Sequence, residues 1–248
     1  MLNLFKRKKG MNFARTVDEV EGAVFEVVRD LGFKRHGRTL HRFVSGDISQ
    51  VIAFQYGRDA GLFINYGIRV PECHERVFHP VTDKKYYHEY ECTLRSRSGT
   101  VSGKKESRYD LSRSKERIIG AIIKEIENVV LPVFDVLKDR KAILENREKY
   151  PLFDDFGATR LLDECMIYGN LGDMEKAKEA FERYYDAAVD EYNAAKNDGR
   201  KIYMRRGERI VFMGQDIRAK KRGYVTLYGT DRGHIDYLER LANDLGLR

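Results

Sequence analysis

The chain has no tryptophan, only four prolines and only three cysteines among its 248 residues. An odd and sparse set of cysteines argues against a secreted domain held together by disulfides. A chain of this length buries roughly 70–75% of its extended surface on folding, so its core needs neither a disulfide nor a structural metal. We therefore expect an ordinary hydrophobic core without covalent cross-links.

Long uncharged apolar runs are also absent. The longest strongly apolar one, Val129–Phe134, is far shorter than the roughly 20 residues that a membrane-spanning helix needs. At the N-terminus the cations follow a very short apolar stretch, whereas in a secretory signal they precede a longer one. These features predict a cytoplasmic protein that makes no integral membrane contact.

Catalytic motifs are missing from the sequence. It contains no Gly-x-Ser-x-Gly elbow, no phosphate-binding Gly-Lys-Ser/Thr loop and no His-Glu-x-x-His helix. Neighbouring acids such as Asp154 and Asp155 are typical of solvated surfaces, since adjacency in sequence does not make two carboxylates converge. We expect a protein that is not an enzyme, has no catalytic residues and binds no cofactor.

One window is rich in potential metal ligands. Zinc accepts nitrogen and sulfur donors of the kind present at Cys73, His79, His88 and Cys92. Their spacing does not match that of a paired short-range zinc knuckle, and Cys92 falls on the inward face of a predicted strand, where a thiol behaves as a small hydrophobe. We expect no metal here, and zinc is the alternative.

Positive charge exceeds negative charge, with 46 Lys and Arg against 39 Asp and Glu. Several basic clusters lie near aromatic residues, a combination that lets rings stack on bases while cations neutralise phosphates. Any contact with nucleic acid or another anion is expected at Arg218, Lys220, Lys221 and Arg222. The alternative is that these cations are solvated loops and strand edges, where lysine prevents aggregation.

The first regular element is a helix predicted over residues 16–31. Thr16 and Glu19 have the spacing of a capping box, and Gly32 suits the left-handed residue that follows a helix. Phe33 is expected to fold back onto the apolar stripe of the helix. This stripe consists of Val17, Val20, Val24, Val27, Val28 and Leu31.

Period-two patterns then predict strands over residues 39–44, 48–56, 62–70 and 90–94, with a tight hairpin at 57–61. Short connections and one-sided alternation favour an antiparallel sheet with one covered face. A second long helix, 114–138, carries an apolar stripe and contains Pro132, which should kink it. The predicted fold class is α+β, with a four-stranded antiparallel sheet covered by two helices and formed by residues 12–145.

A charged stretch at 145–155 that contains Pro151 marks the predicted domain boundary. The second domain, residues 151–248, is expected to contain a helical hairpin and a short strand–helix segment. The hairpin helices are predicted over 158–168 and 173–196, the strand over 224–228, and the last helix over 235–245 with a cap near Asp231.

Several of these segments resemble a known family. LGFKRHGRTLHRF at 31–43, VIAFQY at 51–56, FINYGI at 63–68, CTLRSRSG at 92–99 and YDL at 109–111 resemble the uncharacterised bacterial family called domain of unknown function 4304. The resemblance covers residues 14–140 and departs where that family often carries tryptophans before its second long helix. It implies a fold and a bacterial origin and is almost silent on activity.

A second, shorter likeness lies at residues 169–177. Their sequence, GNLGDMEKA, is similar to the turn of a tetratricopeptide helical hairpin. One such hairpin does not make a solenoid, for which roughly three repeats are needed.

Taken together, these patterns favour a non-enzymatic adaptor or inhibitor that binds another protein, of unidentified nature. An immunity-like role, in which the protein blocks a toxin or an effector, is one concrete version. The sheet domain would serve as a rigid scaffold, and the basic loops and the helical hairpin as contact surfaces. The alternative is a basic accessory protein that binds nucleic acid.

Overall fold

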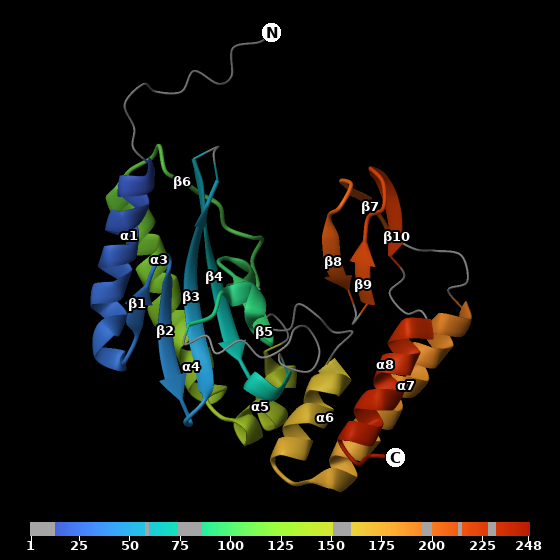
Figure 1. Ribbon diagram of the computed structural model, residues 1–248. Helices are drawn as coiled ribbons and strands as arrows, with labels where there is room; N and C mark the ends of the chain where they lie inside the picture. The colour runs from blue at the N-terminus through green and yellow to red at the C-terminus, as the bar shows by residue number, and fades with distance from the viewer. Residues whose placement is uncertain are drawn as a thin grey trace. The chain divides into compact units, whose positions relative to one another are not determined.

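The protein, seen in a computed structural model (Figure 1), is an α+β protein, as predicted. The structure describes residues 13–57, 60–73, 86–150, 160–194, 200–212, 215–227 and 232–248. The chain divides into two compact units, 1–70 with 84–155 and 71–83 with 156–248. Independent folding of residues 12–145 and 151–248 stays a prediction, and the segment 71–83 falls within the second unit.

The first unit contains a six-stranded antiparallel sheet. Five strands lie in the order β1-β2-β3-β4-β5, and β6 pairs with the first residues of β4. The strands are β1 Lys34–His36, β2 Thr39–Val44, β3 Ile48–Tyr56, β4 Gly61–Arg69, β5 Leu94–Arg97 and β6 Tyr109–Asp110. The predicted strands at 39–44, 48–56 and 62–70 are therefore confirmed, and β1 and β6 are additional.

The fourth predicted strand, residues 90–94, is wrong in its position. Glu89–Glu91 form a short 3₁₀ helix, η2, and pairing with β4 begins only at Leu94. The Glu91 carboxylate accepts a hydrogen bond from the His88 N–H (2.8 Å), which closes this turn. Cys92 then packs on Gly67, where an added Cβ would lie 2.5 Å from the Cys92 Sγ. This segment therefore covers the face of the sheet instead of joining its edge.

Two tight turns set the register of the central strands. Between β2 and β3, Ser45 and Gly46 have φ angles of 46° and 86°, as in the primed turns that suit the twist of a hairpin. Between β3 and β4, the Gly57 N–H donates to the Gly61 carbonyl (2.9 Å), which confirms the predicted hairpin. Both connections are local, and the hairpin at 57–61 was found from the sequence pattern alone.

The first helix, α1, spans Phe13–Val28 and is followed by a 3₁₀ turn, η1, at Arg29–Leu31. The capping box expected at Thr16 is wrong, because residues 13–16 are already helical. The end of the helix is as predicted, since Gly32 has φ 89° and donates to the Arg29 carbonyl (3.0 Å). The fully buried members of the apolar stripe are Val17, Val20, Val24 and Val28.

The second long helix consists of three segments. α3, Lys115–Glu125, begins at Ser114, whose hydroxyl accepts from the Arg117 N–H (3.4 Å). A π-helical turn, η4, follows at Ile126–Val130, and α4 spans Leu131–Val136. The irregularity expected at Pro132 thus takes the form of a π turn directly before it, since proline cannot donate the helical hydrogen bond.

Helices α1, α3 and α4 lie along one face of the sheet (Figure 1). The Gln50 side chain of β3 donates to the Phe134 carbonyl of α4 (2.6 Å), and the Phe33 ring stacks on the Phe134 ring at 6.4 Å. The rest of this unit contains η3, Thr100–Ser102, α5, Arg140–Asn146, and η5, Arg147–Lys149.

The second unit contains three longer helices, α6 Arg160–Asn170, α7 Met174–Ala194 and α8 Arg232–Asp244. The predicted hairpin of α6 and α7 is present, with Gly172 at φ 79° and the Asp173 carboxylate accepting from the Lys176 N–H (3.2 Å). Its likeness to a tetratricopeptide turn stays a prediction. Residues 158–159 and the expected cap Asp231 lie outside the described residues.

Four short strands complete the second unit. They are β7 Arg200–Met204, β8 Arg209–Phe212, β9 Gln215–Arg218 and β10 Gly223–Leu227. The strand predicted at 224–228 corresponds to β10, and the other three were not predicted. Among the described residues, no helix has the length and apolar character needed to cross a membrane.

Candidate nucleic-acid interface

The net charge of the chain is concentrated in one segment. Residues 200–224 contain nine Lys and Arg and two acidic residues, Glu208 and Asp216. Because the whole chain has 46 basic and 39 acidic residues, the rest contains 37 of each. The charge of this segment, +7, therefore equals the net charge of the whole chain, and a segment so charged attracts anions.

The segment folds back on itself as two nested strand pairs. β7 pairs with β10, and β8 pairs with β9, both antiparallel. The inner pair continues beyond its strands, since the Gly207 N–H donates to the Ala219 carbonyl (2.8 Å) and the Ala219 N–H donates to the Glu208 carbonyl (2.9 Å). Met204 and Ala219 are buried. The cationic residues are thus carried on a hydrogen-bonded framework.

Two tyrosines lie opposite each other on the outer strand pair. Tyr203 of β7 is the direct partner of Tyr224 of β10, and their ring centroids are 5.4 Å apart at an interplanar angle of 74°. Tyr203 is 48% exposed and Tyr224 is 73% exposed. The Arg222 Nε donates to the Tyr203 hydroxyl, and the guanidinium carbon lies 5.7 Å from the ring centroid. The surface therefore presents an aromatic pair next to a cation.

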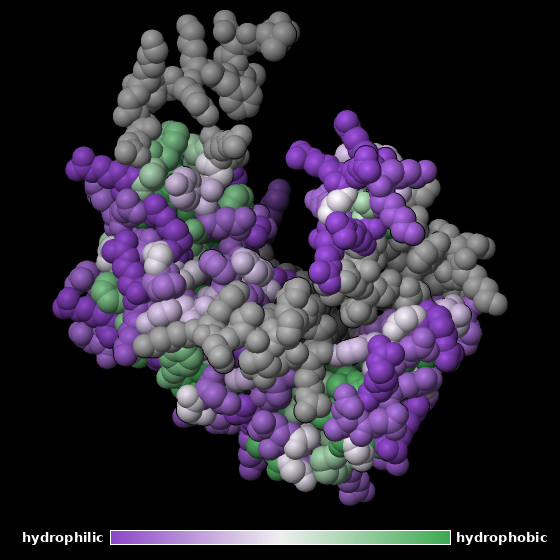
Figure 2. All heavy atoms as spheres, viewed as in Figure 1, coloured by the Kyte–Doolittle hydropathy of each residue, from purple (hydrophilic) through white to green (hydrophobic). Residues whose placement is uncertain are grey.

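Seven cations of this strand segment have exposed side chains. They are Arg205, Arg206, Arg209, Arg218, Lys220, Lys221 and Arg222. Arg209 of β8 is the direct cross-strand partner of Arg218 of β9, and like charges placed opposite each other destabilise a sheet. The acidic Glu208 is engaged locally, because its carboxylate accepts from the Arg205 N–H (2.7 Å). Figure 2 shows hydrophilic atoms gathered over these strands. Exposed cations gathered in this way attract anions.

The four residues predicted for an anion contact, Arg218, Lys220, Lys221 and Arg222, lie together at the end of β9 and in the turn before β10. The structure adds the Tyr203–Tyr224 pair, which the sequence analysis missed. The only signal for it was the regular strand pattern at 224–228, because the partner strand β7 is strongly charged and was not recognised.

The potential metal ligands have other roles in the structure. The Cys73 thiol donates to the Asp163 carbonyl (3.6 Å), and the Cys92 thiol donates to the His88 carbonyl (3.7 Å). Burial raises the pKa of the Cys92 thiol well above its ordinary value, which disfavours the thiolate that zinc requires. His79 lies outside the described residues. In the part of the chain that the structure describes, no three His, Cys, Asp or Glu side chains form a group able to hold a metal ion.

A polar centre inside the first unit was also missed. The Glu125 carboxylate of α3 accepts hydrogen bonds from the Tyr66 hydroxyl (3.0 Å), the Gly99 N–H (2.8 Å) and the Ser98 hydroxyl. Burial, reinforced by the nearby Glu125 charge, raises the pKa of Tyr66 well above its ordinary value. Because its donors all come from the chain itself, this centre connects strand, helix and loop and has a structural role.

Comparison with known families concerns the first unit. Residues 23–136 match the family described as "Domain of unknown function (DUF4304)", which confirms for this region the resemblance inferred from the sequence. The match runs from within α1 to the last residue of α4, so β7–β10 lie outside it. No curated protein and no solved structure matches the chain.

Proposed function

We propose that this is a non-enzymatic, cytoplasmic accessory protein of bacterial origin whose β7–β10 surface binds single-stranded nucleic acid. The observation that carries the proposal is the exposed Tyr203–Tyr224 pair, which Arg222 contacts and which shares its strand segment with six further exposed cations. Aromatic stacking and phosphate neutralisation together are the means by which proteins bind single strands with little sequence preference.

A single strand suits this surface better than a duplex. The bases of a duplex are stacked on one another and present only their edges, so exposed tyrosine faces gain nothing from them. An unpaired strand offers both an open base and a flexible backbone. The seven cations then account for affinity and for its dependence on salt, and the two rings account for the preference for unpaired bases.

The test is fluorescence anisotropy with a labelled oligothymidylate at about 150 mM salt, where non-specific binding has a Kd of roughly 10⁻⁴–10⁻⁶ M. We expect a submicromolar Kd for the wild type. Tyr203→Ala with Tyr224→Ala should weaken binding by about tenfold or more, given roughly 1–3 kcal/mol per stacked base. The triple variant with Arg218→Ala, Lys220→Ala and Lys221→Ala should also bind the oligonucleotide more weakly. Its Kd should change less with salt concentration than that of the wild type.

A matched control removes the same charge elsewhere. Lys104, Lys105 and Lys138 are exposed residues of the first unit, and their replacement by alanine leaves β7–β10 intact. This variant should bind as the wild type does. Equal weakening by both triple variants would mean that only net charge matters, and equal affinity for a duplex would remove the role given to the tyrosines.

The protein-binding role favoured by the sequence remains a second proposal. Leu171 and Met174, at the turn of the α6–α7 hairpin, are 49% and 42% exposed, and exposed apolar side chains of this kind suit a protein contact. An adaptor or immunity-like inhibitor would use this end of the hairpin. Co-purification with the wild type, lost on Leu171→Ser and Met174→Ser, would support it over nucleic-acid binding.

A further inference from the structure

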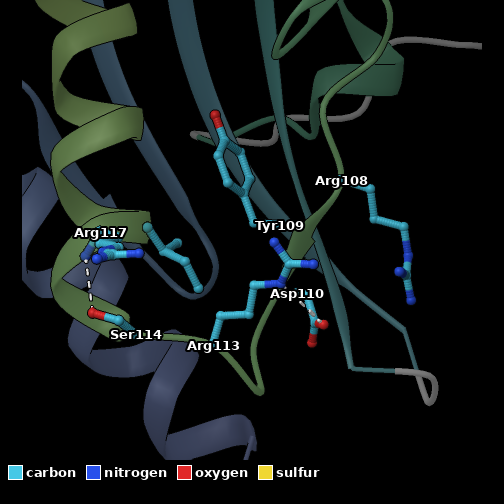
Figure 3. A pocket seen from close by; sticks show the side chains of 7 residues that line it. Arg108, Tyr109, Asp110, Arg113, Ser114 and Arg117 are labelled. Carbon is cyan, nitrogen blue, oxygen red and sulfur yellow. Dashed lines mark hydrogen bonds and ion pairs between the residues drawn. The ribbon is translucent and has the colours of Figure 1, made fainter.

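The first unit contains a cavity of about 540 Å³ between β6 and the start of α3 (Figure 3). Its polar lining is formed by Arg108, Tyr109, Asp110, Arg113, Ser114 and Arg117, and Ile118 adds an apolar wall. Cavities of roughly 300–1,000 Å³ are typical of sites for small molecules. This cavity lies in the other compact unit from β7–β10 and is independent of the function proposed for that surface.

Local hydrogen bonds bring three arginines to the rim of this cavity. β6 pairs with β4, which places Arg108 beside the hairpin, and Gly61 leaves room for its side chain. The chain then turns, with the Arg113 N–H donating to the Asp110 carbonyl (3.0 Å). The cap at Ser114 begins α3 and presents Arg117 one turn later. The three guanidinium groups therefore come from the residue before β6, from a turn and from a helix.

The cavity has an excess of positive charge. Asp110 is its only carboxylate among the described lining residues, and one of its oxygens accepts from the Ser112 N–H (2.9 Å) and hydroxyl (2.7 Å). The other oxygen lies 3.6 Å from the Arg113 Nε. Arg117 has no ion-pair partner within the described ranges. The described lining thus contains three guanidinium groups and one carboxylate, which is already engaged.

The nearby charges of α3 do not cancel this excess. The Lys115 ammonium pairs with Glu19 of α1 (2.6 Å). The Glu116 carboxylate accepts from the Ser114 hydroxyl (2.8 Å), and its pKa is lowered chiefly by a hydrogen bond from its own backbone N–H. The start of the helix is therefore capped by the chain itself, and the attraction for an external anion comes from the arginines.

We propose that this cavity binds an organic phosphate, with the phosphate group held by Arg113 and Arg117 and the organic body lying against Tyr109 and Ile118. Guanidinium groups bind phosphate oxygens through paired, charge-assisted hydrogen bonds. The Tyr109 hydroxyl is engaged with the Ser98 hydroxyl (2.7 Å), so the phenol ring is left as a wall. The volume accommodates a body larger than phosphate alone.

Isothermal titration calorimetry on the full chain tests this with three probes: inorganic phosphate, a nucleoside 5′-monophosphate and the uncharged nucleoside. We expect saturable binding of the monophosphate, weaker binding of inorganic phosphate and none of the nucleoside. Arg113→Ala with Arg117→Ala should weaken monophosphate binding by about tenfold or more, because charge-assisted hydrogen bonds from guanidinium to phosphate are among the strongest in proteins. Both side chains are exposed, so the variant should keep the wild-type circular dichroism.

The matched control is Arg183→Ala with Arg240→Ala, two exposed arginines of the second unit, and it should bind as the wild type does. The variant with Tyr203→Ala and Tyr224→Ala should also keep monophosphate binding, and the Arg113/Arg117 variant should keep oligonucleotide binding. These two variants therefore distinguish a loss of phosphate binding in the cavity from a loss of oligonucleotide binding on β7–β10. Absence of saturable binding, equal binding of the nucleoside, or an unchanged Kd in the Arg113/Arg117 variant would overturn the proposal.

Discussion

The Tyr66 hydroxyl of β4 donates to the Glu125 carboxylate of α3 over 3.0 Å. Tyr66 is fully buried, so this hydrogen bond is made away from water. The same carboxylate also holds the Gly99 N–H of the following loop at 2.8 Å. One side chain thus fixes the helix, the sheet and the loop relative to one another.

Replacing Glu125 by leucine should therefore destabilise the protein. The substitution leaves the donors of Tyr66, Ser98 and Gly99 without their acceptor, and each buried unsatisfied group costs roughly 1–3 kcal/mol. We expect a loss of about 2–4 kcal/mol in the free energy of unfolding, measured by urea denaturation. Glu127→Leu is the control, because Glu127 is exposed on the same helix, and it should change stability by less than about 0.5 kcal/mol.

His41 should make stability depend on acid pH. It is 1% exposed, and burial, aided by His36 and His88, lowers its pKa from 6.5 to about 4. The unfolded chain therefore binds a proton as the pH falls below 6.5, while the folded chain stays neutral until about pH 4. The free energy of unfolding should therefore fall by up to about 3 kcal/mol between pH 6.5 and about pH 4. Above pH 6.5, His41 should have no effect on stability.

The measurement is urea denaturation of the wild type and of His41→Gln from pH 7.5 to pH 4. The glutamine variant lacks the titrating group, so the difference in stability between the two proteins should shift in favour of the variant as the pH falls. A difference that stays constant over the whole range would contradict the pKa assigned to His41.

Gly67 should not tolerate a side chain. A Cβ at this position would lie 2.5 Å from the Cys92 Sγ and 2.8 Å from its Cβ. Because both atoms belong to a buried residue that cannot move away easily, Gly67→Ala should lower stability by about 1–3 kcal/mol. Gly22→Ala in α1 is the control. No atom lies within 4 Å of its added Cβ, so this change should raise stability by about 0.5–1 kcal/mol.

The two-domain division predicts a specific pattern of proteolysis. Helices α1, α3 and α4 already cover one face of the sheet, so we expect residues 12–145 to fold alone. Limited trypsin treatment should cut early between Glu145 and Asp155 and leave a resistant N-terminal fragment. If this stretch resists cleavage and the isolated fragment lacks a cooperative unfolding transition, the chain is a single cooperative unit.

Much of the first unit could be predicted because its signals are local. The valine stripe of α1, the left-handed Gly32 and the hairpin at 57–61 each depend on a few neighbouring residues. The expected cap at Thr16 was wrong, because a capping pattern does not reveal that the preceding residues are also helical.

The burial of Glu21 could not be predicted from its helix alone. This residue lies on α1, yet it is fully buried, because its carboxylate pairs with Arg35 of β1 at 2.5 Å.

The candidate interface could be predicted only in part. Arg218, Lys220, Lys221 and Arg222 are adjacent in sequence, so their clustering was visible. The Tyr203–Tyr224 pair depends on the register between two strands that are separated by a complete hairpin. The cavity of Figure 3 required the pairing of β6 with β4, which covers only two residues and leaves no periodic signal.

The pairing of Arg200 with Leu227 has a practical consequence. Paired residues in antiparallel strands have Cα atoms only about 4.5–5.5 Å apart, so the strand segment leaves and re-enters the α7–α8 connection at neighbouring points. The β7–β10 segment is thus an insertion in the connection between α7 and α8 whose two ends lie close together. Changing the length of this connection there changes the entropy of loop closure only slightly. Another hairpin whose ends lie equally close together should therefore fit in place of this segment.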